Sequence, residues 1–256
     1  MRLTIIGATG MLGSALAAEA AAAGHQVLGA SRSGRTAHGT GFRADAITGE
    51  GIRGAVAGAE AVVYAVNTRR DARAFLVDGL ARTLDAAPPD ALVVVPGIVG
   101  CEALPGGYYR AKVDQERLLA GAGRPGLALR LTQFHELLDL VFATFAARRL
   151  SPRAAVPVQP VAVDVAARAL LDAIEDVRAD PAVTPREVAG PERIRLDEAA
   201  RGWADARGRR LLPVRIPRAP LGGAARGALC PEPGAALELG PTFARWHGRA
   251  DRAAAR

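Results

Sequence analysis

The chain has 256 residues, of which 50% are hydrophobic and only 4% aromatic, and its formal net charge is +7. This length can bury a sizeable core and fits one domain, or one domain with a small appended lobe. No apolar stretch approaches the ~18 residues of a membrane span, and the N-terminus lacks the apolar core and cleavage site of a secretory signal. We therefore expect a cytoplasmic protein without a membrane partner.

The positive charge does not indicate a nucleic-acid surface. Arginines are scattered along the whole chain instead of forming a dense basic run, and few aromatic residues are present for stacking on bases. The two cysteines, Cys101 and Cys230, do not have the spacing of metal ligands. We accordingly expect neither a nucleic-acid partner nor a bound metal.

The N-terminal segment reads as a strand, a glycine turn and a helix. The apolar run 2–6 is followed by Gly7, Gly10 and Gly13 in the spacing G-x-x-G-x-x-G, and then by an alanine-rich stretch. Glycines allow a tight turn and let a pyrophosphate approach the N-terminus of the helix, where free N–H groups favour an anion. Any tight strand-to-helix turn can use glycine, but the strand before and the helix after give the context of a nucleotide site.

The loop after the second expected strand, 25–30, bears on the choice of dinucleotide. An NAD site places an acidic residue near this point, whereas arginine accommodates the 2′-phosphate of NADP. No Asp or Glu lies between Gln26 and Arg43, and the loop contains Ser31, Arg32 and Arg35. These residues favour NADP(H) over NAD(H), the alternative being two arginines in a solvent loop.

Strand and helix patterns then alternate as far as residue 149. We expect an extended segment at 41–44, strands at 61–66, 91–95 and 127–131, and helices at 50–57, 71–87, 108–120 and 133–149. The run 91–95 is continuously apolar, as in a strand buried on both faces of a parallel sheet. This alternation predicts an α/β fold with a doubly wound parallel (Rossmann) sheet that binds its ligand across the carboxyl ends of the strands.

The pattern loosens after residue 150. We expect strands at 154–158 and 187–189, helices at 164–176 (capped by Asp164) and 196–206, and an irregular segment at 213–240, which is rich in proline and glycine. We interpret 1–150 as an NAD(P)-binding core. Residues 151–256 would complete the sheet and form a small C-terminal substrate lobe within a single structural unit, a packing appendage being the alternative.

A tyrosine and the chain's single lysine lie four residues apart within the expected helix 108–120. Lys and Arg together number 33, and only Lys112 is lysine. A lysine kept where arginine is used at every other basic position indicates that an amine is required there. With three tyrosines in the chain, this spacing arises by chance about once in a hundred cases (3/256). Positions i and i+4 share a helix face, so Lys112 can hold a cofactor ribose and favour the phenolate of Tyr108. The alternative is a surface lysine that drift has spared.

Together these motifs resemble the atypical short-chain dehydrogenase/reductase superfamily, in particular its NmrA-like NAD(P)-binding branch. The G-A-T-G-x-x-G of 7–13 and the YxxxK of 108–112 carry the likeness, and the segments 97–100, 130–135 and 159–161 support it. The resemblance covers nearly the whole chain, strongly to about Phe134 and loosely thereafter.

The resemblance implies a set of site residues. By this resemblance Asp45 and Ala46 would flank the adenine, and Val66 and Asn67 would lie along the cofactor. Asp45 could equally be a turn carboxylate, and Asn67 a helix N-cap. Tyr108 and Lys112 would be catalytic. The expected cofactor residues are Gly7, Thr9, Gly10, Met11, Leu12, Gly13, Ser31, Arg32, Arg35, Asp45, Ala46, Val66, Asn67, Gly97 and Lys112, and the expected substrate residues are Tyr109, Phe134, His135 and Gln159.

One position departs from the family pattern. Relatives carry a serine where this chain has Gly97, and the serine hydroxyl helps to hold the substrate carbonyl. Loss of one such donor costs roughly 10²–10³ in rate. Tyr109, Thr132 and His135 are candidate replacements, although His135 also suits a structural role at an apolar helix start.

These observations favour an NADPH-dependent oxidoreductase acting on a carbonyl, a quinone or an activated double bond of a small molecule. Tyr108 would donate the proton, with its pKa lowered by the ammonium of Lys112. Two alternatives stay open. One is a non-enzymatic NADP(H) redox sensor, which the missing serine suits. The other is an epimerase, isomerase or cyclase that uses the same tyrosine.

Overall fold

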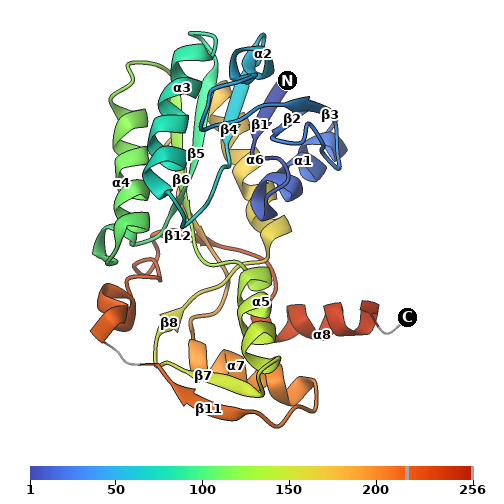
Figure 1. The fold of residues 1–256 in the computed structure, drawn as a ribbon, viewed down its shortest axis with the longest axis vertical. Coiled ribbons are helices and arrows are strands. Elements are labelled where there is room, and N and C mark those ends of the chain that lie inside the picture. The colour runs from blue at the N-terminus through green and yellow to red at the C-terminus, as the bar shows by residue number, and fades with distance from the viewer. Residues whose placement is uncertain (217–218, 255–256) are drawn as a thin grey trace. The chain divides into compact units, whose positions relative to one another are not determined.

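The structure is a computed structural model that describes residues 1–216 and 219–254 (Figure 1). The chain divides into two compact units that alternate along the sequence. Unit 1 comprises Met1–Gly97, Gly106–Arg130 and Ala167–Pro185, and unit 2 comprises Ile98–Pro105, Leu131–Ala166 and Arg186–Arg256. The division into domains 1–150 and 151–256 stays a prediction.

Unit 1 is built on a parallel sheet. The strand order is β6-β5-β4-β1-β2-β3, and the pairs β1–β2, β1–β4, β2–β3 and β4–β5 are parallel. The order reverses between β1 and β4, so the carboxyl ends of these two strands mark the crevice where such sheets bind ligands. The predicted doubly wound fold is confirmed, with strands β1 Arg2–Ile6, β2 Gln26–Ser31, β3 Thr40–Arg43, β4 Ala61–Tyr64, β5 Leu92–Ile98 and β6 Gly126–Leu131.

Helices cover both faces of this sheet. In Figure 1, α3 and α4 lie on one side of it and α1 and α6 on the other. The central strands β4 and β5 are apolar because both of their faces are covered. Val62, Tyr64 and Val93 are at most 1% exposed. The helices with residues in unit 1 are α1 Met11–Ala22, α2 Ile52–Val56, α3 Gly79–Ala86, α4 Gly107–Ala120 and α6 Val163–Ala179.

The helix expected at 71–87 is present, since residues 72–86 are helical without a break. A π-helical turn, η1 (Ala74–Asp78), precedes α3. The hydroxyl of Tyr64 on β4 donates a hydrogen bond to the Phe75 carbonyl, and a side chain at Gly79 would overlap that hydroxyl. Burial raises the pKa of Tyr64 far above its usual value, so this hydroxyl keeps its proton. A buried side chain from another element therefore sets the irregular helix geometry here.

Unit 2 contains three short strand pairs and three helices among the described residues. β7 pairs in parallel with β11, β8 antiparallel with β10, and β9 in parallel with β12; β9 also pairs with Leu131 at the end of β6. The bounds are β7 Leu150–Arg153, β8 Pro157–Val158, β9 Glu187–Ala189, β10 Ile194–Arg195, β11 Leu212–Arg215, β12 Ala236–Glu238, α5 His135–Ala146, α7 Leu196–Ala206 and α8 Phe243–Ala254.

Three expectations for this part of the chain are wrong. The single strand expected at 154–158 is two strands, β7 and β8, on either side of residues 154–156. The segment 213–240 is not wholly irregular, since it holds most of β11, the 3₁₀ segment Ala219–Arg226 and β12, while its residues 217–218 lie outside the described residues. Asp164 does not cap α6, because the helix begins at Val163, whose N–H donates to the carboxylate of Glu136 at 3.0 Å.

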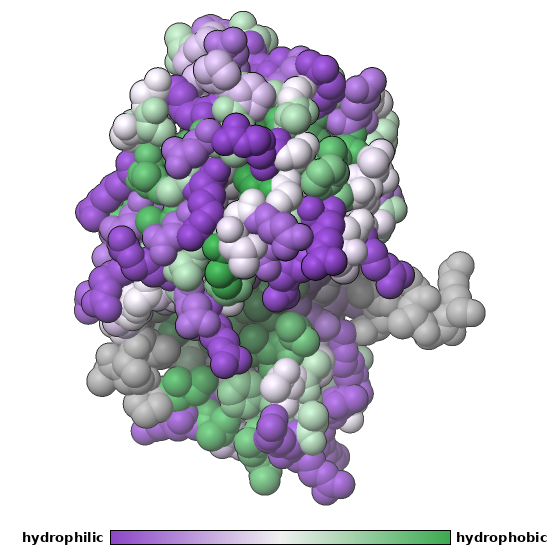
Figure 2. Space-filling view, turned by 45° about the horizontal axis from the view of Figure 1, so that its top comes forward, coloured by the Kyte–Doolittle hydropathy of each residue, from purple (hydrophilic) through white to green (hydrophobic). Residues whose placement is uncertain are grey.

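No helix among residues 1–216 and 219–254 is long and apolar enough to cross a membrane. Figure 2 shows hydrophilic side chains over much of the visible face, with apolar ones commoner toward the lower end of the view. Among the exposed large apolar residues of unit 2 are Leu140 and Leu212, at 58% and 68% exposure.

Candidate functional site

The glycine turn follows β1 directly and leaves no space for side chains. Gly7 has a φ of 91°, and a Cβ on it would lie 2.9 Å from the amide nitrogen of Val66. A Cβ on Gly13 would overlap the Gly7 carbonyl oxygen. These two glycines therefore allow α1 to start close against the ends of β1 and β4, as in dinucleotide-binding turns.

The N-terminus of α1 has the free donors that an anion requires. Gly10 is its N-cap and makes no side-chain capping hydrogen bond, and the first helical bond from this turn is Ser14 N–H to the Gly10 carbonyl at 2.8 Å. The N–H groups of Met11, Leu12 and Gly13 thus have no partner within the helix. Together with the exposed Thr9, this cradle fits a pyrophosphate.

The loop after β2 presents two arginines to solvent. The hydroxyl of Ser31 donates to the Arg35 carbonyl at 2.8 Å, and the Gly34 N–H donates to the Ser31 carbonyl at 3.1 Å. These bonds close a tight turn from which the exposed Arg32 and Arg35 project. No carboxylate lies within 4.0 Å of either guanidinium in the described part of the chain. The loop therefore fits the 2′-phosphate of NADP.

Asp45 has the local role that the sequence left open as an alternative. Its Oδ1 accepts hydrogen bonds from the N–H groups of Ile47 and Thr48, at 2.7 and 3.3 Å. The carboxylate therefore closes a turn after β3. Ala46 beside it is 7% exposed and belongs to the buried core of unit 1. A contact of either residue with adenine stays a prediction.

Asn67 and Tyr108 meet beyond the end of β4. The Tyr108 hydroxyl donates a hydrogen bond to Asn67 Oδ1 at 2.8 Å, across 41 residues of sequence. Asn67 is not a helix N-cap, because the next helical residue is Ala72. The ring of Tyr108 packs against a small buried cluster that includes Ala72, Leu76 and Ala111. The phenol is thus held at both ends, by apolar packing and by an amide.

Lys112 lies one turn further along α4 and is buried, with 4% of it exposed. Its ammonium donates to the Pro96 carbonyl at 2.6 Å and to Gln115 Oε1 at 2.7 Å. Pro96 belongs to β5, so the lysine ties α4 to the carboxyl end of the sheet. The alternative of a spared surface lysine is therefore wrong, whereas contact with a ribose stays a prediction.

Arg69 and Tyr109 complete this corner of unit 1. The Arg69 guanidinium lies 5.2 Å from the centre of the Tyr108 ring and 5.8 Å from that of Tyr109, and it donates to the Tyr109 hydroxyl at 3.4 Å. The two tyrosine rings contact each other edge to face, with centroids 5.0 Å apart. We call Asn67, Arg69, Tyr108 and Tyr109 the Tyr108 corner.

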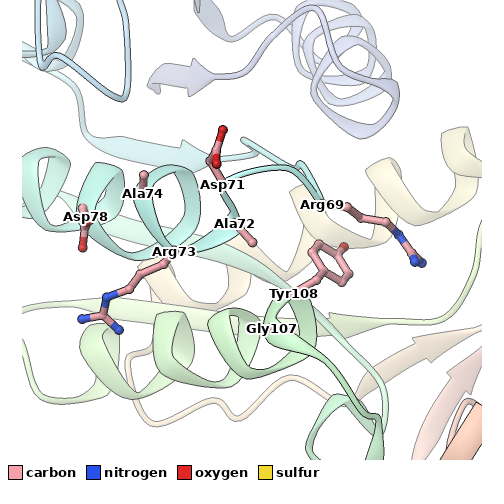
Figure 3. A pocket seen from close by; sticks show the side chains of 8 residues that line it. All are labelled: Arg69, Asp71, Ala72, Arg73, Ala74, Asp78, Gly107 and Tyr108. Atoms are coloured by element: carbon pink, nitrogen blue, oxygen red, sulfur yellow. The ribbon is translucent and has the colours of Figure 1, made fainter. Parts of the chain in front are cut away.

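A pocket of about 550 Å³ opens beside the Tyr108 corner (Figure 3). It lies between the loop and helical turn that follow β4 and the start of α4. Figure 3 shows Tyr108 and Arg69 at one end of it and Arg73 and Asp78 at the other. Its lining residues are Arg69, Asp71, Ala72, Arg73, Ala74, Asp78, Gly107 and Tyr108.

The position of the missing serine is filled by an ion pair. A Cβ on Gly97 would overlap Glu116 Oε1 and would lie 2.9 Å from Arg130 Cγ. Arg130 binds Glu116 through Nε and Nη2, the shortest distance being 2.8 Å, and the two side chains are 28% and 14% exposed. No local sequence pattern indicates this pair, although Glu116 lies four residues after Lys112 on the same helix.

The expected substrate residues outside the Tyr108 corner belong to unit 2. His135 has no exposed surface, and its Nε2 donates to the Pro160 carbonyl at 2.8 Å. Burial lowers its pKa to about 4, so the ring is neutral at pH 7. Gln159 is 5% exposed and donates to Gly190 O and Glu238 Oε1, while the Thr132 hydroxyl donates to the Gln159 carbonyl at 2.6 Å. These groups are occupied by structural hydrogen bonds, and the structure gives their substrate roles no support. Phe134 is the half-buried N-cap of α5.

Sequence reasoning missed Arg69 and the hydrogen bond between Asn67 and Tyr108. Both depend on contacts across about 40 residues, which no local pattern shows. One signal was available for Arg69, because it follows the carboxyl end of a parallel strand beside the point where the strand order reverses.

Comparison with known proteins supports the fold. No family model and no curated protein matches the sequence. Solved structures do match: an NADPH-dependent quinone oxidoreductase from Escherichia coli in complex with NADPH has a TM-score of 0.78 and 16% identity over 97% of this chain and 99% of that one. A putative epimerase from Burkholderia cenocepacia has a TM-score of 0.73 and 21% identity, covering 98% of each chain.

A short-chain dehydrogenase/reductase superfamily protein from Agrobacterium tumefaciens with bound NAD has a TM-score of 0.72 and 16% identity, over 100% of this chain and 98% of that one. At such identities the likeness concerns the fold, whose strand order and glycine turn unit 1 shows independently. The chain therefore has the same fold as these solved structures.

Proposed function

We propose that the protein is a cytoplasmic NADPH-dependent oxidoreductase that reduces a carbonyl, a quinone or an activated double bond of a small molecule. The observation that carries this proposal is the pocket-facing Tyr108, held by Asn67 in the same unit as a glycine turn that fits a pyrophosphate. That one of the matched structures is an NADPH-dependent quinone oxidoreductase supports it. We propose no nucleic-acid or membrane partner.

Binding of the cofactor would use the main chain at one end and arginines at the other. The N–H groups at the start of α1 would receive the pyrophosphate, and Arg32 and Arg35 the 2′-phosphate. NADPH, when bound, supplies the hydride. The protein's part is to orient the substrate and to provide a proton at the oxygen that gains charge.

Tyr108 would donate that proton. Its hydroxyl donates to Asn67 Oδ1, and a substrate oxygen in the pocket would replace this acceptor. The buried ammonium of Lys112, one turn along the same helix face, would favour the phenolate that remains. Proton transfer by a positioned group of this kind contributes roughly 10²–10⁴ in rate.

Asn67 would supply the donor that serine supplies in relatives. Gly97 cannot be replaced by serine without displacing Glu116, so a second hydrogen bond to the substrate oxygen must come from elsewhere. Asn67 uses its Oδ1 on Tyr108, and its amide NH₂ makes no hydrogen bond to the described residues. An amide has two donors on that nitrogen, and one of them can reach an oxygen that also accepts from Tyr108.

The experiment combines NADPH binding with NADPH oxidation. Titration of the purified chain should enhance NADPH fluorescence, with tighter binding of NADPH than of NADH. Oxidation should then be followed at the nicotinamide absorbance band with a panel of quinones, ketones, aldehydes and enones. Absence of binding, or binding without oxidation by any acceptor, would contradict the proposal.

A second candidate is an epimerase that uses the same tyrosine. The matched structures include a UDP-galactose 4-epimerase, with a TM-score of 0.68 and 16% identity over 84% of this chain and 86% of that one. Consumption of NADPH separates the two functions, because an epimerase returns its hydride and shows no net oxidation of the cofactor.

A further inference from the structure

We propose that the substrate carries an oxyanion, a carboxylate or a phosphate group, which Arg69 binds beside Tyr108. This inference rests on the proposed function, since it names the substrate class of the same site. It follows from how Arg69 is held, from the balance of charge in the pocket, and from the position of Arg69 relative to the phenol.

Two aromatic rings hold the guanidinium of Arg69 in place. Its Cζ lies 5.2 Å from the centre of the Tyr108 ring and 5.8 Å from that of Tyr109, with a hydrogen bond to the Tyr109 hydroxyl at 3.4 Å. Stacking over rings restricts the guanidinium without neutralising its charge. The planar fork keeps most of its five N–H donors for another acceptor, and a carboxylate or phosphate accepts two of them side by side.

The loop that carries Arg69 is itself fixed. The Thr68 hydroxyl donates to the Arg70 carbonyl and accepts from the Arg70 N–H, both at 3.1 Å. The next residue of the pocket wall, Asp71, has a φ of 49°, which is uncommon for a residue with a side chain. The main chain on both sides of Arg69 is thus held in a defined turn between β4 and the π-helical turn.

Two charged residues of the pocket lining, Asp71 and Arg73, each lie near a side chain of opposite charge. Asp71 lies 4.0 Å from Arg70, and Arg73 lies 3.9 Å from Asp114. No carboxylate oxygen comes within 4.0 Å of the Arg69 guanidinium in the ranges 1–216 and 219–254. Asp78 lies at the opposite end from Tyr108 (Figure 3). The Tyr108 end therefore presents one cation without an anionic partner.

Arg69 and Tyr108 both line the pocket, and Figure 3 shows the Arg69 side chain extending beyond the Tyr108 ring, away from Arg73 and Asp78. A ligand that contacts the phenol would meet the guanidinium on that side of the ring. In a substrate whose carbonyl oxygen receives the Tyr108 proton, the separate carboxylate or phosphate group would point toward the guanidinium of Arg69. The pocket lining also includes the apolar side chains of Ala72 and Ala74. The geometry suits a small molecule whose oxyanion is separated from the reducible carbonyl by a short apolar or sugar-like body.

The first test compares charged and neutral substrates of matched shape. Catalytic efficiency of NADPH oxidation is measured with phenylpyruvate against its methyl ester, and with dihydroxyacetone phosphate against dihydroxyacetone. We expect the native chain to prefer the charged member of at least one pair by about 10–100-fold, the range of one charge-assisted hydrogen-bond pair. Which pair shows the preference distinguishes carboxylate from phosphate.

Variants assign the preference to Arg69. Arg69→Met should remove it and Arg69→Lys should keep part of it. The matched control is Arg110→Met, because Arg110 is an exposed arginine of α4 that does not line the pocket. This control should keep the full preference. An unchanged preference in Arg69→Met, or a native preference for the neutral members, would overturn the inference.

A binding measurement separates this inference from the proposed function. Oxamate and inorganic phosphate are titrated into the full chain without cofactor, and the guanidinium ¹⁵N signals of the native, Arg69→Met and Arg110→Met proteins are followed by NMR. Arg69-dependent binding without NADPH oxidation by any acceptor would uphold the oxyanion site and contradict the reductase. Oxidation of neutral substrates with no Arg69-dependent binding would uphold the reductase and contradict the oxyanion site.

Discussion

At the glycine turn the main chain occupies the space that side chains would need, whereas at the Tyr108 corner four side chains from two distant segments converge. Gly7 and Gly13 are fixed by contacts with backbone atoms of the turn and of β4. Tyr108 and Tyr109 are instead fixed by Asn67 and Arg69, about 40 residues earlier in the chain. Binding of a diphosphate and proton transfer thus rest on different kinds of constraint.

The difference matters for how each region responds to change. A turn built from backbone contacts tolerates no added atom, and its failure should appear in both stability and cofactor affinity. A site built from exposed or half-exposed side chains can lose one group with little cost to the fold. Substitutions at the glycine turn should therefore lower both stability and cofactor affinity. Substitutions at the Tyr108 corner should lower activity with little effect on stability.

The largest effect on stability is expected for Gly7→Ala. The added Cβ would be 2.9 Å from Val66 N, and the φ of 91° is strained for alanine. Strain and overlap together should lower the free energy of unfolding by about 2–6 kcal/mol. Urea denaturation measures this loss, and NADPH affinity should fall with it.

Gly24→Ala is the matched control for that change. Gly24 has a similar φ of 81°, but a Cβ there would meet nothing within 4 Å. Its cost should be limited to backbone strain, about 1–3 kcal/mol, with NADPH affinity kept. Equal losses in the two variants would mean that close contact at the turn contributes nothing.

The next effect extends the comparison to unit 2, where His135 was expected to contact substrate. Burial lowers its pKa from 6.5 to about 4, so the folded state resists a proton that the unfolded state accepts. Stability should therefore be lost as the pH falls from about 6.5 to about 4, by on the order of 3 kcal/mol from this residue. Urea denaturation at pH 7, 5.5 and 4.5 measures the loss.

His135→Gln should flatten that pH dependence, because an amide can still donate to the Pro160 carbonyl and does not titrate in this range. The exposed His38→Gln is the control and should leave the dependence as it is. An undiminished dependence in His135→Gln would show that other groups cause the acid loss.

The smallest effect tests the position of the missing serine. Gly97→Ser should lower the free energy of unfolding by about 1–3 kcal/mol, because the new Cβ displaces a Glu116 carboxylate that Arg130 holds. It should not raise turnover. In a Glu116→Ala background the same substitution should cost less, and a double-mutant cycle measures the difference. A gain in activity from Gly97→Ser alone would mean that the Glu116–Arg130 ion pair moves aside at little cost in free energy.

Local patterns predicted much of the fold. Helix α7 and strand β9 have the predicted bounds, and the alternation up to β6 gave the doubly wound sheet. The helix expected at 71–87 contains a π-helical turn at Ala74–Asp78, where the Tyr64 hydroxyl of β4 donates to the Phe75 carbonyl. Helix α8 was not expected, and its Phe243 and Trp246 stack against each other and against His135. Such contacts between distant segments leave no periodicity to detect.

The candidate site divides in the same way. The glycines, Tyr108 and Lys112 were predicted because they occur at fixed spacings in the sequence. These spacings determine the relative positions of the residues on the turn and on one helix face. The partner of the Tyr108 hydroxyl, the stacking of Arg69 and the filling of the Gly97 position depend on which segments the sheet brings together. Residue types alone therefore named the proton donor but not the groups that hold it.

The measurement that tests the central claim most directly is the effect of Tyr108→Phe on two quantities, the dissociation constant for NADPH and the single-turnover rate of NADPH oxidation. The affinity should stay within about twofold, since the glycine turn and not the phenol binds the diphosphate, while the rate should fall by about 10²–10⁴. A near-native rate, or a loss of affinity as large as the loss of rate, would contradict the role of Tyr108 as proton donor.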